Sequence, residues 1–275
     1  MPTLKGVTCD LYVDDSRAEE YGMTVHDNVC TVWVAAIENK EYGFEIEVDP
    51  KQTGADAHML SFWADGQELT GNIMGEGDNT ISVHEVCIGV NDCGSQVWRP
   101  LKFGKLETEE EGGLELDEDA AKHVGILEWS ICRCERVWDS DTQPEPLYFE
   151  SKNSINEKSV KGRAVSHCTE LGDSFVVPNQ PWLEAEPRDP DETPFVRFRF
   201  KYVSIDLLNM QGFIQRPEVS FGPLWREVVS LRFAPLVSRK TQERNIENRS
   251  RRRPGTRRKL LGELAEQEKK KKPRA

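Results

Sequence analysis

Apolar and polar side chains alternate with a period of two along most of this 275-residue chain, and this pattern constrains the fold more than any other feature. Successive side chains of a β-strand point to opposite faces, so the period predicts strands with one buried and one solvated face. Residues 42–48 (YGFEIEV) are the clearest case. Residues 29–36 are apolar on both faces, which predicts a central strand. We expect strands at residues 7–13, 29–36, 42–48, 58–64, 68–73, 80–90, 97–103, 124–137 and 195–203.

Two local signals predict a turn and a helix. Asp65-Gly66 between two alternating segments is typical of a tight hairpin turn, so residues 58–64 and 68–73 should pair. Ser204 is expected to cap a short helix that ends at Gly212.

Three segments are predicted to be surface connections that add nothing to the core. Residues 107–119 are acidic and contain glycine, and residues 139–146 and 178–194 are rich in proline and aspartate. Such composition is typical of exposed loops.

The strand pattern predicts an all-β fold for residues 1–236. We expect an antiparallel β-sandwich, jelly-roll-like, with one or two short helices and a disordered basic C-terminal tail. The predicted core includes Trp33, Phe44, Ile46, Phe198 and Phe200.

Charge is distributed unevenly along the chain. Residues 239–275 hold 15 Lys and Arg against 5 Asp and Glu, a net charge of +10, whereas the rest holds 21 against 43, a net charge of −22; together these give the −12 of the whole chain. Low hydrophobicity with high net charge predicts that residues 237–275 are disordered.

Two dense basic clusters in this tail predict nuclear targeting. Their residues are Arg251, Arg252, Arg253, Arg257, Arg258, Lys259, Lys269, Lys270, Lys271, Lys272 and Arg274. We therefore expect a nuclear protein, with a cytoplasmic location as the alternative. The same clusters are compatible with binding nucleic acid or another polyanion, because lysine and arginine beside phosphates release counterions.

Neither export nor insertion into a membrane is expected. No apolar run approaches the roughly 18 residues of a membrane helix, and the amino terminus has no basic-then-apolar pattern. The seven cysteines are irregularly spaced, which predicts free thiols rather than a disulfide framework.

Common catalytic and nucleotide-binding motifs are absent from the sequence. We therefore expect a protein that is not an enzyme and needs no cofactor. A metal site is considered at Cys132 and Cys134 with His167 and Cys168, because thiolates and imidazole suit zinc. The surrounding alternation favours an ordinary strand with partly buried thiols instead.

An anion site is a second candidate, at Lys158, Lys161, Arg163 and His167. These residues lie in a polar segment, residues 152–169, and positive side chains of this kind bind phosphate. The alternative is an exposed loop or edge strand whose lysines discourage pairing with other chains.

Several short segments occur in an order that resembles a known family. They are residues 6–14, 44–48, 65–66, 124–126, 157–172, 198–202, 207–208 and 212–214. Together they resemble a family of fungal proteins that is defined as a domain of unknown function (domain of unknown function 7918 type). The resemblance implies a β-sandwich-like domain followed by a variable tail, and it implies no activity. At residues 201–204 the chain departs from the Tyr-Arg-Ser or Tyr-Arg-Pro of the family, which leaves no arginine there to assign a role.

Two functions follow as hypotheses. The first is a non-catalytic interaction module whose acidic domain binds an unknown protein partner, for instance a basic one such as a histone, while the tail targets the nucleus. The second is an enzyme or a small-ligand or anion-binding sandwich with a site near His167. A flat acidic face favours the first hypothesis, and a deep pocket at His167 favours the second.

Overall fold

The computed structural model describes residues 1–140, 146–190 and 193–214, and residues 1–216 form one compact unit. The strands are β1 (Thr3–Leu4), β2 (Val7–Val13), β3 (Ser16–Arg17), β4 (Glu20–His26), β5 (Val29–Ala35), β6 (Tyr42–Val48), β7 (His58–Ala64), β8 (Gln67–Met74), β9 (Thr80–Val83), β10 (Glu85–Val90), β11 (Gln96–Lys105), β12 (Glu107–Glu109), β13 (Ile126–Ser140), β14 (Ser154–Asn156), β15 (His167–Leu171), β16 (Phe175–Val177), β17 (Trp182–Pro187) and β18 (Val196–Val203). The helices are α1 (Pro50–Thr53), α2 (Glu118–His123), α3 (Glu157–Val160) and α4 (Ile205–Met210).

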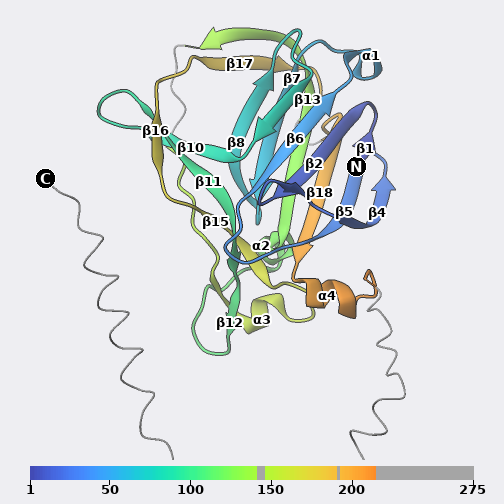
Figure 1. The fold of residues 1–275 in the computed structure, drawn as a ribbon, viewed down its shortest axis with the longest axis vertical. Helices are drawn as coiled ribbons and strands as arrows, with labels where there is room; N and C mark the ends of the chain where they lie inside the picture. The colour runs from blue at the N-terminus through green and yellow to red at the C-terminus, as the bar shows by residue number, and fades with distance from the viewer. Residues whose placement is uncertain (141–145, 191–192, 215–275) are drawn as a thin grey trace, which may run out of the picture. The chain divides into compact units, whose positions relative to one another are not determined.

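The largest sheet mixes parallel and antiparallel strands, and the second and third sheets are antiparallel (Figure 1). The largest has the order β4-β5-β18-β13-β7-β8, with β17 paired to β13. In it β18 runs parallel to β5, and the other pairs are antiparallel. A second sheet has the order β1-β2-β6-β9, with β3 on β2, and a third has β10-β11-β15, with β16 on β11. The fold is therefore mostly β, as predicted.

The inner faces of the two larger sheets share one hydrophobic core. Phe44 of β6 contacts Phe62, Trp129 and Phe200 of the largest sheet, with ring centroids 5.3, 5.6 and 5.3 Å apart. Edge-to-face packing of this kind adds to the gain from burying the rings. Four of the five predicted core residues, Phe44, Ile46, Phe198 and Phe200, are fully buried, which confirms those assignments.

The prediction for Trp33 was wrong. On β5 the core side is formed by Cys30, Val32 and Val34, and Trp33 points to the opposite face. There its ring lies 5.5 Å from that of Phe213 and 5.1 Å from the Lys201 Nζ. Because residues 29–36 are apolar on both faces, their period does not distinguish the core side from the outer side.

Two segments predicted to be plain surface connections contain structure. Residues 107–119 include β12, and Leu116 packs against a second small core cluster. Residues 178–194 include β17, which pairs with β13. Because β12 and most of β17 are exposed, their residues lack the apolar alternation that predicts a strand, and their polar composition predicted loops instead.

The number of short helices and the division of residues 80–90 also differ from expectation. The described residues hold four short helices rather than one or two. Residues 80–90 form β9 and β10, which belong to different sheets. The chain changes sheet at His84, a switch that continuous alternation does not reveal.

The predicted hairpin and helix cap are confirmed. Asp65 and Gly66 both have positive φ, 52° and 81°, as the turn between β7 and β8 requires. The Ser204 Oγ accepts a hydrogen bond from the backbone N–H of Leu207, which caps α4.

The predicted tail and both basic clusters lie outside the described residues, and so does the predicted domain boundary at residue 236. Across the ranges that the structure describes, none of the helices has the length and apolarity that a membrane crossing requires.

Candidate functional site

The four residues of the predicted anion site lie in different local surroundings. Lys158 and Lys161 line a hollow of about 380 Å³, but Glu110, Glu111 and Glu157 line it too. Three carboxylates beside two ammonium groups oppose the binding of an anion.

Arg163 and His167 are occupied elsewhere. The Arg163 guanidinium donates to the backbone carbonyl of Ala121. His167 is 8% exposed, and its Nδ1 lies 2.8 Å from the Ser166 Oγ, which also accepts from the Ser204 N–H at 2.7 Å. Burial lowers the pKa of His167, so the imidazole is neutral at pH 7 and helps to hold the start of α4.

The cysteines of the considered zinc site lie on separate sheets. Cys132 and Cys134 are on β13, while His167 and Cys168 are on β15. Across the described ranges, no group of three or more His, Cys, Asp or Glu side chains is arranged to hold a metal ion. None of the seven cysteines, all within the described ranges, forms a disulfide, and burial raises the pKa of Cys168 to about 12, which keeps that thiol protonated.

Sequence reasoning placed Asp65 in a turn but missed that its side chain is the centre of a buried polar network. Asp65 is 2% exposed, and its carboxylate accepts from the Tyr202 hydroxyl at 2.7 and 2.8 Å. The backbone N–H groups of Gly125 and Thr169 donate to the two oxygens at 2.7 Å each. Burial raises the pKa of Asp65, while these donors and the Lys152 charge act in the opposite direction.

The network continues through hydroxyl groups to β6. The Thr169 Oγ1 lies 3.4 Å from the Tyr202 hydroxyl and 3.0 Å from that of Tyr42. The turn after β7 is thus connected to β6, β15, β18 and the start of β13. Asp65, Gly125 and Tyr202 belong to the segments that carry the family resemblance, and here they meet in one structural network.

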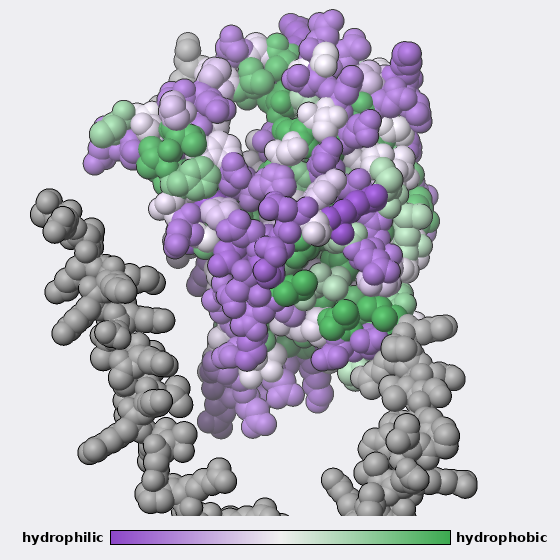
Figure 2. All heavy atoms as spheres, viewed as in Figure 1, coloured by the Kyte–Doolittle hydropathy of each residue, from purple (hydrophilic) through white to green (hydrophobic). Residues whose placement is uncertain are grey.

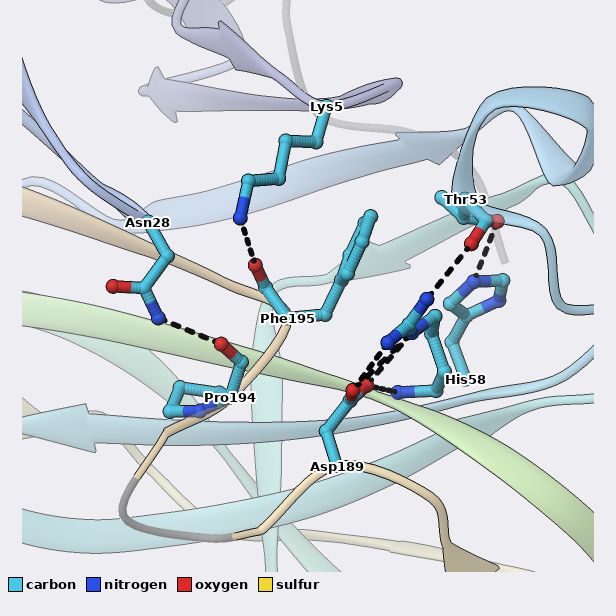
Figure 3. Close-up of polar contacts among 8 residues, drawn as sticks. Lys5, Asn28, Thr53, His58, Asp189, Pro194 and Phe195 are labelled. Atoms are coloured by element: carbon cyan, nitrogen blue, oxygen red, sulfur yellow. Dashed lines mark hydrogen bonds and ion pairs between the residues drawn. The ribbon is translucent and has the colours of Figure 1, made fainter.

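A second polar cluster holds the segment between β17 and β18 (Figure 3). Arg133 donates to both oxygens of Asp189, through Nη2 at 2.6 Å and Nε at 3.0 Å, and its guanidinium lies 4.5 Å from the Phe195 ring. Hydrogen bonding from Arg133 lowers the pKa of Asp189. Beside it, the buried His58 Nε2 lies 3.0 Å from the Thr53 Oγ1. Arg133, Asp189 and His58 are thus already paired within the protein. We assign them a structural role rather than a role in binding a ligand.

A strongly acidic surface, which we call the acidic face, extends over β2, β6 and the neighbouring turns. It is formed by Asp14, Asp15, Glu41, Glu45, Glu47 and Glu85, together with Asp10, which is only 9% exposed. Within the described residues, the acidic face forms ion pairs with only two basic side chains: Arg17 pairs with Asp10 at 2.8 Å, and Lys40 pairs with Asp14 at 2.6 Å. In Figure 2, hydrophilic residues cover most of the surface over β2 and β6.

A hollow of about 500 Å³, which we call the outer hollow, lies on the outer side of the largest sheet. Its lining combines polar and apolar side chains from β7, β8, β13, α2 and β18: Met59, Ser61, Trp63, Gly66, Glu68, His123, Ile126, Glu128, Ser130, Cys132 and Arg197. His167 is not among them, so the predicted ligand site near His167 has no counterpart in this hollow.

A family model described as a domain of unknown function (DUF7918) matches residues 6–217. No curated protein and no solved structure matches the chain.

Proposed function

The chain belongs to the DUF7918 family, and from that premise we propose that it is a non-catalytic protein-interaction module with a β-sandwich domain and a basic, nuclear-targeting tail. Its partner is a protein with a basic surface. The fungal source implied by the resemblance belongs to this proposal, as does the sandwich architecture. The packing of Phe44 against three aromatic residues of the opposite sheet supports the sandwich.

The acidic face is the observation that carries the proposal. Asp10 and Glu45 are register partners on neighbouring strands, and Glu47 follows Glu45 on the same side of β6. The sheet fixes the backbone positions of these residues, so their carboxylates stay close together, and such a cluster of negative charge attracts a basic surface and speeds its association. Histones are one class of basic partner that fits this charge.

The alternative, an enzyme or ligand binder with a site near His167, has less support. His167 is nearly buried and bonded to Ser166. Asp65 is a carboxylate with a raised pKa, a property typical of acid-base catalysts, but its oxygens are held by internal donors. Neither group is available to a substrate in this arrangement.

Capture from nuclear extract tests the interaction. We expect the full chain to retain a basic protein that is lost when Glu41, Glu45 and Glu47 are all changed to glutamine. A matched control changes Glu110, Glu111 and Glu115 to glutamine, which removes the same charge from exposed positions outside the acidic face. Equal capture by both variants would refute the role of the acidic face.

A separate experiment tests whether the tail directs the protein to the nucleus. We expect residues 239–275 to carry an inert fluorescent protein into the nucleus, and alanine at Arg251 to Arg253 and Lys269 to Lys272 to abolish its entry. A cytoplasmic full-length protein, or a grafted tail that fails to enter, would instead leave the tail as a polyanion-binding arm or a segment without this role.

A further inference from the structure

We propose that the outer hollow binds a neutral, hydroxyl-rich ring, the chemistry of a monosaccharide or a short oligosaccharide. This site is separate from the acidic face, since the two lie on different sheets. The volume of about 500 Å³ falls within the range of about 300–1,000 Å³ that is typical of small-molecule sites.

Strand register explains why the surface is hollow at this point. Ser130 of β13 lies opposite Ser61 of β7, and this pair of small side chains is flanked by larger ones. On one side Glu128 lies opposite Trp63, and on the other Cys132 lies opposite Met59. The two serines therefore form a low floor between taller walls.

Three hydrogen-bonding groups in the hollow, the hydroxyls of Ser61 and Ser130 and the indole N–H of Trp63, have no partner among the described residues. Ser130 is 5% exposed, and no described residue bonds its hydroxyl or that of Ser61. The Trp63 indole N–H likewise has no acceptor among the described residues. Neither the Ser130 hydroxyl nor the Trp63 N–H is a fully buried atom, so water or a ligand can reach both, and a ligand that displaces the water must supply the same hydrogen bonds. These groups converge on the same space, so one ligand with several hydroxyls can satisfy them together.

The charges at the rim favour a neutral ligand. The Glu128 carboxylate lies between two guanidinium groups: its Oε1 is 3.2 Å from the Arg197 Nε in an ion pair without hydrogen-bond geometry, and its Oε2 is paired with Arg199. A ligand cation would compete with these arginines, and an anion would face the carboxylates of Glu128 and Glu68. The Arg197 Nη groups and the Glu128 oxygens are suited to bond hydroxyl groups.

Apolar lining explains the preference for a ring over a small polar solute. Trp63, Ile126 and Met59 present indole and aliphatic surface beside the serines. The C–H face of a sugar ring packs on an indole while its hydroxyls reach the polar groups. A wholly apolar ligand would leave the serines and Trp63 N–H unpaired, which costs affinity.

Saturation-transfer NMR on the full chain tests this proposal. The probes are glucose, galactose, mannose, N-acetylglucosamine, cellobiose and maltose, each at about 10 mM, enough to detect a Kd of about 1 mM. We expect transfer to at least one sugar. Trp63→Ala should weaken its binding at least tenfold, while Trp138→Ala, which removes a 44% exposed tryptophan from outside the hollow, should leave binding unchanged.

Ser130→Ala keeps the test decisive if Trp63→Ala fails to fold. Loss of one hydroxyl should weaken binding by about threefold to tenfold, as the loss of one hydrogen bond does. The proposal is overturned if none of the six sugars shows transfer, or if a sugar binds equally well to the wild type and to every folded variant of Trp63 and Ser130.

Discussion

The network around Asp65 and the outer hollow are both built from polar groups next to the same sheet, but they are completed differently. Each Asp65 oxygen accepts hydrogen bonds from groups of the protein, and the carboxylate is buried. In the outer hollow, Ser61, Ser130 and Trp63 have no such partners among the described residues. Polar character or a shifted pKa therefore does not mark a functional site by itself. A candidate site also needs polar groups that are unpaired where a ligand can reach them.

The largest loss of stability is expected for Asp65→Ala, which disrupts the fully paired network. It leaves the backbone N–H groups of Gly125 and Thr169 buried without an acceptor, and it leaves the Tyr202 hydroxyl with only the Thr169 Oγ1 at 3.4 Å. At about 1–3 kcal/mol for each orphaned donor, the loss of stability is on the order of 5 kcal/mol. Urea unfolding measures it, with the exposed Asp173→Ala as control. A loss for Asp65→Ala as small as that of the control would mean that the network is not structural.

A smaller loss, about 2 kcal/mol at pH 7, is expected for Asp189→Asn, because Arg133 then loses a charged bidentate partner. The pKa of Asp189 is lowered in the folded state, so this carboxylate stabilises the fold above its unfolded pKa of about 3.9. The contribution disappears as the pH falls through the folded pKa. Urea titrations at successive pH values should therefore show wild type and variant converging in acid, and a constant difference would contradict the assignment.

The buried His58 is also expected to make stability depend on pH, because burial disfavours its charged form. Its folded pKa is lowered, chiefly by burial, so below a pH of about 6.5 the unfolded chain binds a proton that the folded protein resists. Stability should fall as the pH drops below 6.5 and level off below the folded pKa. His58→Gln should flatten this part of the stability profile, whereas His26→Gln, which changes an exposed histidine, should leave it as in the wild type.

The smallest change in stability is expected for Ser130→Ala, which removes an unpaired hydroxyl from the outer hollow. Since no described residue bonds this hydroxyl and water can reach it, its removal should change the free energy of unfolding by less than about 0.5 kcal/mol. Thermal or urea unfolding in the absence of sugar measures it. A loss above about 1 kcal/mol would show that Ser130 has a structural partner and would remove the contrast with Asp65.

Sequence periodicity predicted the core of this fold because the burial of Phe44, Ile46, Phe198 and Phe200 follows directly from alternation. It did not place Trp33, because both faces of β5 are apolar. The hairpin turn was found from Asp65-Gly66, yet nothing local indicates that this carboxylate reaches Thr169 and Tyr202, far away in the chain. The outer hollow arises from register between β7 and β13, which one sequence does not specify.

Calorimetric titration with a lysine-rich synthetic peptide tests whether the acidic face binds basic partners. The wild type, the variant with glutamine at Glu41, Glu45 and Glu47, and the control variant with glutamine at Glu110, Glu111 and Glu115 all retain the basic tail and can be compared as full chains. Loss of three clustered carboxylates should weaken binding at least tenfold, about 1.4 kcal/mol, while the control variant should bind within about twofold of the wild type. Equal affinity of the three proteins for the peptide would show that the acidic face does not recognise basic partners.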